Sequence, residues 1–492
     1  MTAEVTFEDD LAVAACHYLP MRSFVTFAAA LILATPVAAQ TAQQAAAPPD
    51  RHTLSLAAGY KAAFLCSGMF NAGLDQETVA ADDLTRIYVE LRQPVQDLPA
   101  VIDREARTVS VAFAEDFPPR IALWRPHLGC VQAPPGGSAD APLPRLTVEG
   151  PDLAATDALP WPMGDAGATP ATAPSPALSA LVGSAFDRAS FGEGSETTAV
   201  IVVKDGRIIA EQYRDGFGPH VSQRTWSVGK SLAASVIGAA VMDGIIDLDA
   251  RAPVPEWRRD GDPRADITTE NLLHMASGLW TEGPGNRTDD VYFGGTLVAE
   301  RSAGLPLEAM PGARWRYANN DTLLAMRGLR GAMNDDDRFL AYPFQRVFWK
   351  IGMTRTVPET DWGGDFIFSS QVWTTARDLA RLGLLYLNDG VWNGERVLPQ
   401  GWADYVATPA PAQPANVATG GAGYGAQFWL FGPDQGLPEG TYAAQGNRGQ
   451  YLMIVPSENV LIVRRGFDSV GPGGEGFDIA RFSAEVLSVL ED

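Results

Sequence analysis

Ser227 and Lys230 are the residues whose types and spacing best fit a chemical role. They stand in the segment TWSVGKS, directly before the alanine-rich apolar run of residues 231–242. In a helix that begins near Ser227, residues three apart lie on one face, so the Lys230 amine can reach the Ser227 hydroxyl. A serine hydroxyl becomes nucleophilic when an adjacent base takes its proton, and burial lowers the pKa of a lysine toward that role. The pair therefore predicts a nucleophile with its base.

An ordinary helix start is the alternative interpretation, because serine is a common N-cap residue. Two observations favour catalysis. The chain has four lysines, and of these only Lys230 follows a serine by three positions. Lys230 also stands where an apolar helix enters the core, a costly place for an unpaired ammonium. A triad with His274 stays open, but no serine has the Gly-x-Ser-x-Gly flanks typical of the α/β-hydrolase class.

Three motifs taken in order resemble those of the serine β-lactamase and penicillin-binding protein superfamily. They are the Ser-Val-Gly-Lys segment 227–230, the Tyr-Ala-Asn segment 317–319, and the Gly-Asn-Arg-Gly-Gln segment 446–450 just before an apolar strand. Their order and spacing are similar to the class C-like branch, which includes esterases, D-amino-acid peptidases and nylon-oligomer hydrolases. The resemblance covers residues 179–492, and segments 272–279 and 372–399 look like that branch's scaffold.

The resemblance implies a role for each matching residue. Ser227 would attack the substrate carbonyl and form an acyl-enzyme, Lys230 would act as general base, and Tyr317 would relay the proton to the leaving group. Asn319 would hold Lys230 and the substrate amide. The oxyanion would lie between the backbone N–H groups of Ser227 and Gln450, a preorganised pair of donors. A core tyrosine and a turn asparagine are the alternatives for positions 317 and 319.

The third motif departs from the family pattern. Where lactam-hydrolysing members resemble Lys-Thr-Gly, this chain has Asn447, Arg448 and Gly449. Asparagine cannot supply the positive charge that binds a substrate carboxylate, and adjacent strand residues face opposite sides, so we expect Arg448 to point away from the pocket. The departure favours a small amide or ester as substrate. The alternatives are a β-lactamase or D-alanyl carboxypeptidase acting on β-lactams or cell-wall peptides, and a non-catalytic binding module with a retained fold.

The elements that must position these residues indicate an α+β fold. An Asp-Gly pair at 205–206 separates two apolar runs, 198–203 and 207–213, and this is a strong hairpin signal. A second hairpin is expected at 451–465. Strands at both ends with helical patterns between them predict one antiparallel, β-lactamase-like sheet flanked by helices, with a helical subdomain and a small N-terminal segment. The expected helices cover residues 231–242, 269–275, 322–329, 375–387 and 477–490.

The beginning of the chain has the layout of a secretory signal. Arg22, the apolar run 24–33 and the small residues 37–39 fit its three regions, so we expect synthesis to start at Met21, with residues 1–20 outside the protein. The remaining ranges are 21–39 for the signal peptide, 40–131 for an N-terminal extension, 132–178 for a linker rich in Pro, Ala and Gly, and 179–492 for the hydrolase domain. The apolar run is shorter than the roughly 20 residues of a membrane span, so no stable anchor is expected.

Cysteine usage and charge constrain the compartment and the partners. Cys66 and Cys130 would remain after signal cleavage, and an even pair in an exported protein predicts a disulfide, with two buried thiols as the alternative. The net charge of −22 disfavours nucleic acid and anionic membrane surfaces. The five histidines are scattered without metal-binding spacing. We therefore expect a periplasmic or secreted enzyme that acts on a small-molecule amide or ester, without cofactor or metal.

Overall fold

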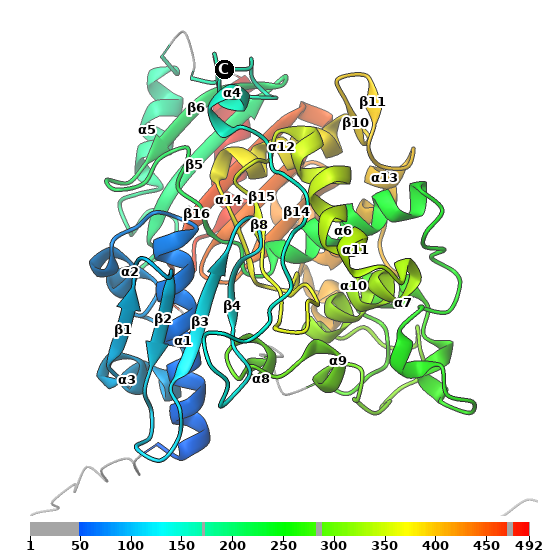
Figure 1. Cartoon of the computed structure of the whole chain (residues 1–492). Coiled ribbons are helices and arrows are strands. Elements are labelled where there is room, and N and C mark those ends of the chain that lie inside the picture. The colour runs from blue at the N-terminus through cyan, green and yellow to red at the C-terminus, as the bar shows by residue number, and fades with distance from the viewer. Residues whose placement is uncertain (1–48, 170–172, 282–287, 470–475, 492) are drawn as a thin grey trace, which may run out of the picture. The chain divides into compact units, whose positions relative to one another are not determined.

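A seven-stranded antiparallel sheet forms the centre of the fold (Figure 1). The computed structural model describes residues 49–169, 173–281, 288–469 and 476–491, so the predicted signal segment lies outside the described residues. Both predicted hairpins are confirmed, and Asp205 and Gly206 adopt the positive φ values that the tight turn requires. The strand order is β12 (Gly423–Tyr424), β13 (Trp429–Phe431), β14 (Thr441–Gly446), β15 (Gln450–Val455), β16 (Val460–Gly466), β5 (Thr197–Lys204) and β6 (Arg207–Tyr213).

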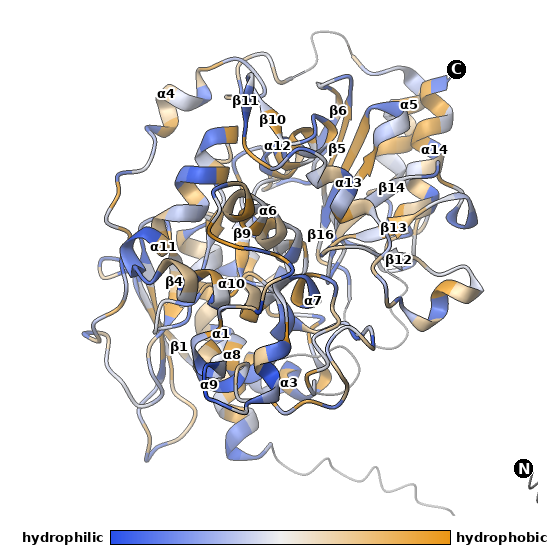
Figure 2. Ribbon diagram, turned by 90° about the vertical axis from the view of Figure 1, so that its right-hand side faces the viewer, coloured by the Kyte–Doolittle hydropathy of each residue, from blue (hydrophilic) through white to orange (hydrophobic). Residues whose placement is uncertain are grey.

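Helices cover both faces of this sheet because the strand side chains alternate between two apolar cores. On one face Ile201 and Val463 pack with α6 (Val228–Met242) and α12 (Ala376–Leu387). On the other face Val200 and Ile462 pack with α5 (Pro176–Ser184) and α14 (Ile479–Glu491). In Figure 2, α6 is drawn mostly in hydrophobic colours, as expected of a helix buried nearly all round. The α+β prediction is confirmed.

A helical region lies beside the α6 face of the sheet. Its longest member, α10 (Asn319–Met333), packs against α6 and α7 (Thr269–Leu273). A three-stranded sheet in the order β7 (Gln223–Arg224), β9 (Val372–Thr374) and β8 (Val357–Pro358) leads into the N-terminus of α6. The other α-helices and strands that follow the N-terminal segment are α4 (Leu153–Asp157), α8 (Asp289–Tyr292), α9 (Val298–Arg301), α11 (Asp336–Pro343), α13 (Trp402–Ala407), β10 (Val391–Trp392) and β11 (Glu395–Arg396).

The N-terminal segment builds a small α/β layer of its own. It comprises α1 (Arg51–Phe70), α2 (Gln76–Asp82), α3 (Val89–Asp97) and an antiparallel sheet of β1 (Ala100–Asp103), β2 (Thr108–Val111), β3 (Arg120–Arg125) and β4 (Gly129–Gln132). Its core is shared with the rest of the chain, because α1 side chains cluster with Trp226, Phe293 and Trp373. The predicted disulfide is confirmed: Cys66 in α1 is bonded to Cys130 in β4, with 6.1 Å between the Cα atoms.

Residues 132–169 and 173–178, the described parts of the expected linker, contact the hydrolase part. Trp161 donates a hydrogen bond to the Gly206 carbonyl (2.9 Å), and Asp157 is paired with both terminal nitrogens of Arg355. Residues 49–492 group into one compact unit, and the expected boundaries at 131 and 178 stay predictions. Among the described residues, no helix combines the length and the apolar character needed to cross a membrane.

Loss of the disulfide should lower the free energy of unfolding. The bond joins residues 64 positions apart, and in the chain-entropy model a loop of that length restricts the unfolded state by about 4 kcal/mol. We expect the denaturant midpoint to fall in a Cys66→Ser/Cys130→Ser variant and equally in the parent protein under reductant. Equal midpoints with and without reductant would contradict this expectation.

Candidate active site

Ser227 stands at the N-terminus of α6 but does not act as an ordinary cap. The helix begins at Val228, and the Ser227 side chain makes no capping hydrogen bond to the helix backbone. Its Oγ instead accepts a hydrogen bond from Lys230 Nζ at 3.0 Å. The preceding residue, Trp226, has φ of 50°, a left-handed conformation that is unfavourable for a bulky side chain. The Ser227 hydroxyl is therefore hydrogen-bonded to Lys230, as the spacing predicts, and does not cap the helix.

Lys230 is buried among neutral partners. Its side chain is almost fully enclosed, and Nζ also donates to Asn319 Oδ1 (2.6 Å) and to the Ser369 carbonyl oxygen (2.8 Å). Burial lowers the pKa of Lys230 well below the ordinary value of a lysine, because the charged form loses its hydration. None of these three hydrogen-bond partners carries a negative charge that would raise the pKa of Lys230 again. A lysine in this environment can be neutral and can accept the Ser227 proton.

Tyr317 is the third side chain of the arrangement and contacts both Ser227 and Lys230. It lies two residues before α10, its side chain hydrogen-bonds with Ser227, and Lys230 Nζ is 4.9 Å from its ring centroid. Burial raises the pKa of Tyr317, while the Ser227 hydrogen bond opposes that shift. The phenol is therefore protonated near neutral pH and can pass a proton on. Asn319 is the first residue of α10, from which its side chain reaches Lys230.

Aromatic side chains flank Tyr317. Trp429 is stacked on it with ring centroids 5.6 Å apart, and Tyr424 meets it edge-on at 6.1 Å. Trp315 contacts all three rings. Tyr317 is therefore surrounded by aromatic rings, of which Trp315 and Trp429 are partly exposed and Tyr424 is buried.

The third motif lies directly before an apolar strand, β15, as the sequence predicts. It forms the turn between β14 and β15, so Gly446 at the end of β14 is the residue that approaches the nucleophile. A Cβ at position 446 would collide with the Thr225 carbonyl oxygen and would lie 3.1 Å from the backbone nitrogen of Ser227. The next backbone N–H after Gly446 is that of Asn447. Only glycine allows such proximity of two backbones.

Gly449 and Gln450 are held on the far side of this turn. Arg464 donates to the Gly449 carbonyl (2.8 Å), and the buried Gln450 side chain binds Arg465 (2.6 Å) and the Gly466 carbonyl oxygen. From the close approach of Gly446 to Ser227 we propose the Asn447 amide, in place of that of Gln450, as the second oxyanion donor. Residues 447–449 form a turn between the two strands, so the residue that follows the close approach at Gly446 is Asn447. Arg448 points away from Ser227, as expected, toward residues 82–85.

Ser369 and Tyr292 also belong to the hydrogen-bond network around Lys230, although no sequence motif marks them. The Ser369 carbonyl binds Lys230, and the Ser369 hydroxyl hydrogen-bonds with Tyr292 (2.6 Å); both belong to segments outside the three motifs. His274, the alternative base, packs its ring 5.7 Å from Tyr405, and burial lowers its pKa to about 4. Ser227 is thus partnered by Lys230 and Tyr317 rather than by His274.

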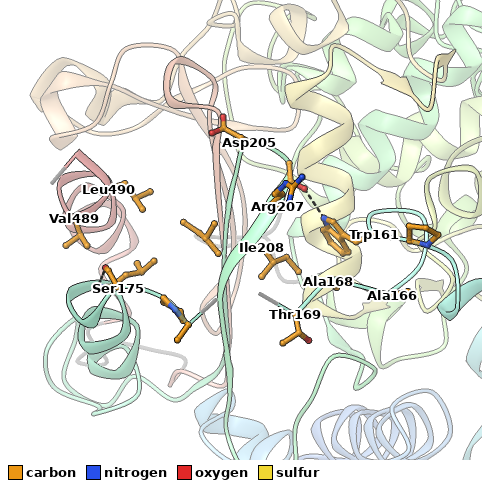
Figure 3. Close-up of a pocket in the computed structure, with 17 residues that line it drawn as sticks. Trp161, Ala166, Ala168, Thr169, Ser175, Asp205, Arg207, Ile208, Val489 and Leu490 are labelled. Carbon is orange, nitrogen blue, oxygen red and sulfur yellow. Dashed lines mark hydrogen bonds between the residues drawn. The ribbon is translucent and has the colours of Figure 1, made fainter. Parts of the chain in front are cut away.

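A cavity of about 930 Å³ lies elsewhere in the fold, along the sheet edge formed by β6 (Figure 3). Trp161, Ile208 and Leu490 are among its lining residues. Three strands separate β6 from β14, which carries Gly446, so this cavity is not part of the catalytic arrangement.

One group of potential metal ligands occurs in the described part of the chain. Side-chain atoms of Asp157, Asp165 and His220 lie within 4.8 Å of one another. Arg355 binds Asp157, and Arg381 binds Asp165 at 2.7 Å, so guanidinium groups already neutralise both carboxylates. We interpret the group as a structural ion-pair cluster.

Comparison with known proteins agrees with this geometry. A family model described as Beta-lactamase matches residues 184–464, the stretch that carries Ser227, Lys230 and Tyr317. The 6-aminohexanoate-dimer hydrolase of Paenarthrobacter ureafaciens is 27% identical over 299 residues, which cover 54% of this chain and 72% of that protein.

Solved structures show the same fold. A putative beta-lactamase from Bacteroides dorei DSM 17855 superposes with a TM-score of 0.53 at 22% identity, covering 65% of this chain and 100% of that one. A family VIII carboxylesterase gives a TM-score of 0.52 at 14% identity, covering 65% and 98%.

Proposed function

Because the chain belongs to the beta-lactamase family and is a serine hydrolase, we propose that it cleaves a small amide or ester through an acyl-enzyme on Ser227. The observation that carries the proposal is the buried Lys230, whose Nζ lies 3.0 Å from Ser227 Oγ and has neutral hydrogen-bond partners. A lysine held in this way has a lowered pKa and can serve as base at neutral pH.

The mechanism follows from the positions of these groups. Lys230 accepts the Ser227 proton as Oγ attacks the substrate carbonyl carbon. The backbone N–H groups of Ser227 and Asn447 stabilise the oxyanion. Tyr317 delivers a proton to the leaving nitrogen or oxygen as its bond to the carbonyl carbon breaks. The proton on Lys230 then passes to Tyr317, which leaves Lys230 neutral again. Water attacks the acyl-enzyme carbonyl carbon as Lys230 takes one of its protons, and Lys230 returns that proton to Ser227 Oγ as the carboxylic acid leaves.

The surroundings of the site support a substrate without a recognised carboxylate. Strand β14 offers Ala443, Ala444 and Gln445 before Gly446, and Arg448 is turned toward another segment. Next to Tyr317, the partly exposed Trp315 and Trp429 favour an apolar acyl or leaving group. Among the relatives and structural neighbours are a 6-aminohexanoate-dimer hydrolase and a carboxylesterase, and these names support an amide or an ester.

A panel of substrates tests this choice. We expect turnover of a p-nitrophenyl ester and of a short linear amide, and kcat/KM for benzylpenicillin should be lower by about tenfold or more. The reason is that a missing hydrogen bond to a charged group costs about 1.5–3 kcal/mol. Faster hydrolysis of the penicillin than of every linear substrate would favour the β-lactamase alternative. A stable Ser227 adduct without turnover would favour the binding module.

Export is also part of the proposal. The signal-like segment 21–39 and the disulfide between Cys66 and Cys130 support a periplasmic or secreted protein, since structural disulfides persist in oxidising compartments.

A further inference from the structure

We propose that the N-terminal segment helps to position the active site. Its residues 82–85 bind Arg448 and thereby fix the turn that supplies the second oxyanion donor. This inference rests on the proposed function, because it concerns the same oxyanion site. Arg448 is a positioning residue here, since its guanidinium contacts backbone carbonyl groups and no reacting atom.

Arg448 is bound by carbonyl groups from two distant parts of the chain. The side chain is almost fully buried, and Nη2 donates to the carbonyl oxygens of Asp82 (2.8 Å) and Thr85 (3.1 Å). On the other side, Nε donates to the Asp468 carbonyl oxygen (3.2 Å). Weaker contacts reach the carbonyl oxygens of Asp83 and Phe467, both at 3.4 Å. A guanidinium with five donors in a fixed plane fits this set, whereas an ammonium would satisfy fewer of the carbonyl groups.

The residues that receive Arg448 are themselves fixed. They comprise Asp82, the last residue of α2, and the three residues after it, and carbonyl groups at a helix C-terminus favour a cation. Tyr60 donates to the Asp83 carbonyl oxygen (3.1 Å), and Gln96 donates to that of Leu84 (2.7 Å). These contacts tie the receiving residues to α1 and α3. The N-terminal segment therefore offers a rigid support.

The backbone of Arg448 is part of the turn at 446–449, which supplies the proposed second oxyanion donor. Gly446 lies against the Ser227 amide, Asn447 follows it, and Asn447 Oδ1 accepts a hydrogen bond from the Arg448 backbone N–H (2.9 Å). Arg448 has φ of 60°, a left-handed conformation that is unfavourable for a non-glycine residue. The buried guanidinium contacts hold the residue in that conformation. A displacement of Arg448 would therefore rotate the Asn447 amide out of place.

A second contact of the same segment supports the nucleophile. The ring of Phe64 in α1 lies 6.0 Å from that of Trp226, which adopts the left-handed conformation directly before Ser227. The Arg224 guanidinium lies over both rings, at 4.7 and 4.1 Å. Each oxyanion donor is thus adjacent in sequence to a residue that the N-terminal segment contacts: Ser227 follows Trp226, and Asn447 precedes Arg448.

The experiment compares Arg448→Met with Arg86→Met. Arg86 also joins the N-terminal segment to the hydrolase part, through Glu196 (3.0 Å). Its ion pair with Asp82 (3.9 Å) uses the carboxylate of that residue, whereas Arg448 binds the Asp82 backbone carbonyl oxygen. In Arg448→Met we expect kcat/KM for the ester to fall about a hundredfold, mainly in kcat, because a misplacement of about 1 Å costs that much. The Ki of a phosphonate transition-state analogue should rise in proportion. Arg86→Met should lower the melting temperature and leave both quantities near those of the parent.

The outcomes separate this inference from the proposed function. A parent protein that neither hydrolyses the ester nor reacts with a fluorophosphonate at Ser227 would overturn both. An active parent, with Arg448→Met within about twofold of it or with the same loss in Arg86→Met, would overturn the positioning role alone. If Arg448→Met does not fold, Arg448→Lys serves instead, since it retains a donor, and about a tenfold loss with the same proportional rise in Ki is expected.

Discussion

Ser227→Ala should abolish turnover of every substrate that the parent protein hydrolyses. The variant retains the fold, because the Ser227 side chain makes no capping hydrogen bond and the residue lies only partly buried at the helix end. It lacks the atom that forms the acyl-enzyme, so Lys230 and Tyr317 have no hydroxyl to activate. Removal of the nucleophile from a serine hydrolase lowers kcat by about four orders of magnitude or more.

Intact-mass spectrometry with a fluorophosphonate gives the measurement. The parent should gain one adduct, and Ser227→Ala should gain none. Ser231→Ala is the matched control, because Ser231 lies one turn further along α6 and its hydroxyl donates to the Gln427 carbonyl (2.7 Å) rather than to a catalytic group. This control should label at nearly the parent rate. Hydrolysis by Ser227→Ala at the parent rate would exclude the proposed nucleophile.

The sequence predicts what depends on local spacing. Ser227 and Lys230 are three residues apart in one helix, so a helical pattern alone brings their side chains together. The Asp205-Gly206 turn is equally local, because its positive φ values restrict the residue types that can occupy it. In both cases the partners are neighbours in the chain. Their geometry follows from the element that contains them.

The sequence does not predict contacts that arise only when distant segments meet. The register of the third motif depends on whether residues 447–449 form a turn or a strand, and both fit the same letters. The Ser369 carbonyl on Lys230 is a backbone group, which any residue type could supply. Arg448 finds its partners more than 350 positions earlier, at Asp82 and Thr85. These three features could be identified only from the folded structure.

The pH dependence of kcat/KM should report the buried Lys230. Burial lowers the pKa of this amine well below its ordinary value, and the base must be neutral to accept the Ser227 proton. Activity should therefore rise with pH through that lowered pKa and stay high at pH values where a free lysine is still charged. Lys230→Met should lose about a thousandfold in kcat/KM, within the range for a general base.

Asn319→Asp tests the cause of that low pKa. Asn319 Oδ1 lies 2.6 Å from Lys230 Nζ, so an aspartate of the same shape would place a negative charge against the amine. A nearby opposite charge favours the ammonium form and raises the pKa of Lys230. The rising limb of the profile should then move to higher pH, and activity at neutral pH should fall. Asn319→Leu removes the same hydrogen bond without adding charge, so its limb should not move upward. An unmoved limb in Asn319→Asp, or an equal upward shift in Asn319→Leu, would mean that the limb belongs to another group, because only the aspartate changes the charge beside Lys230.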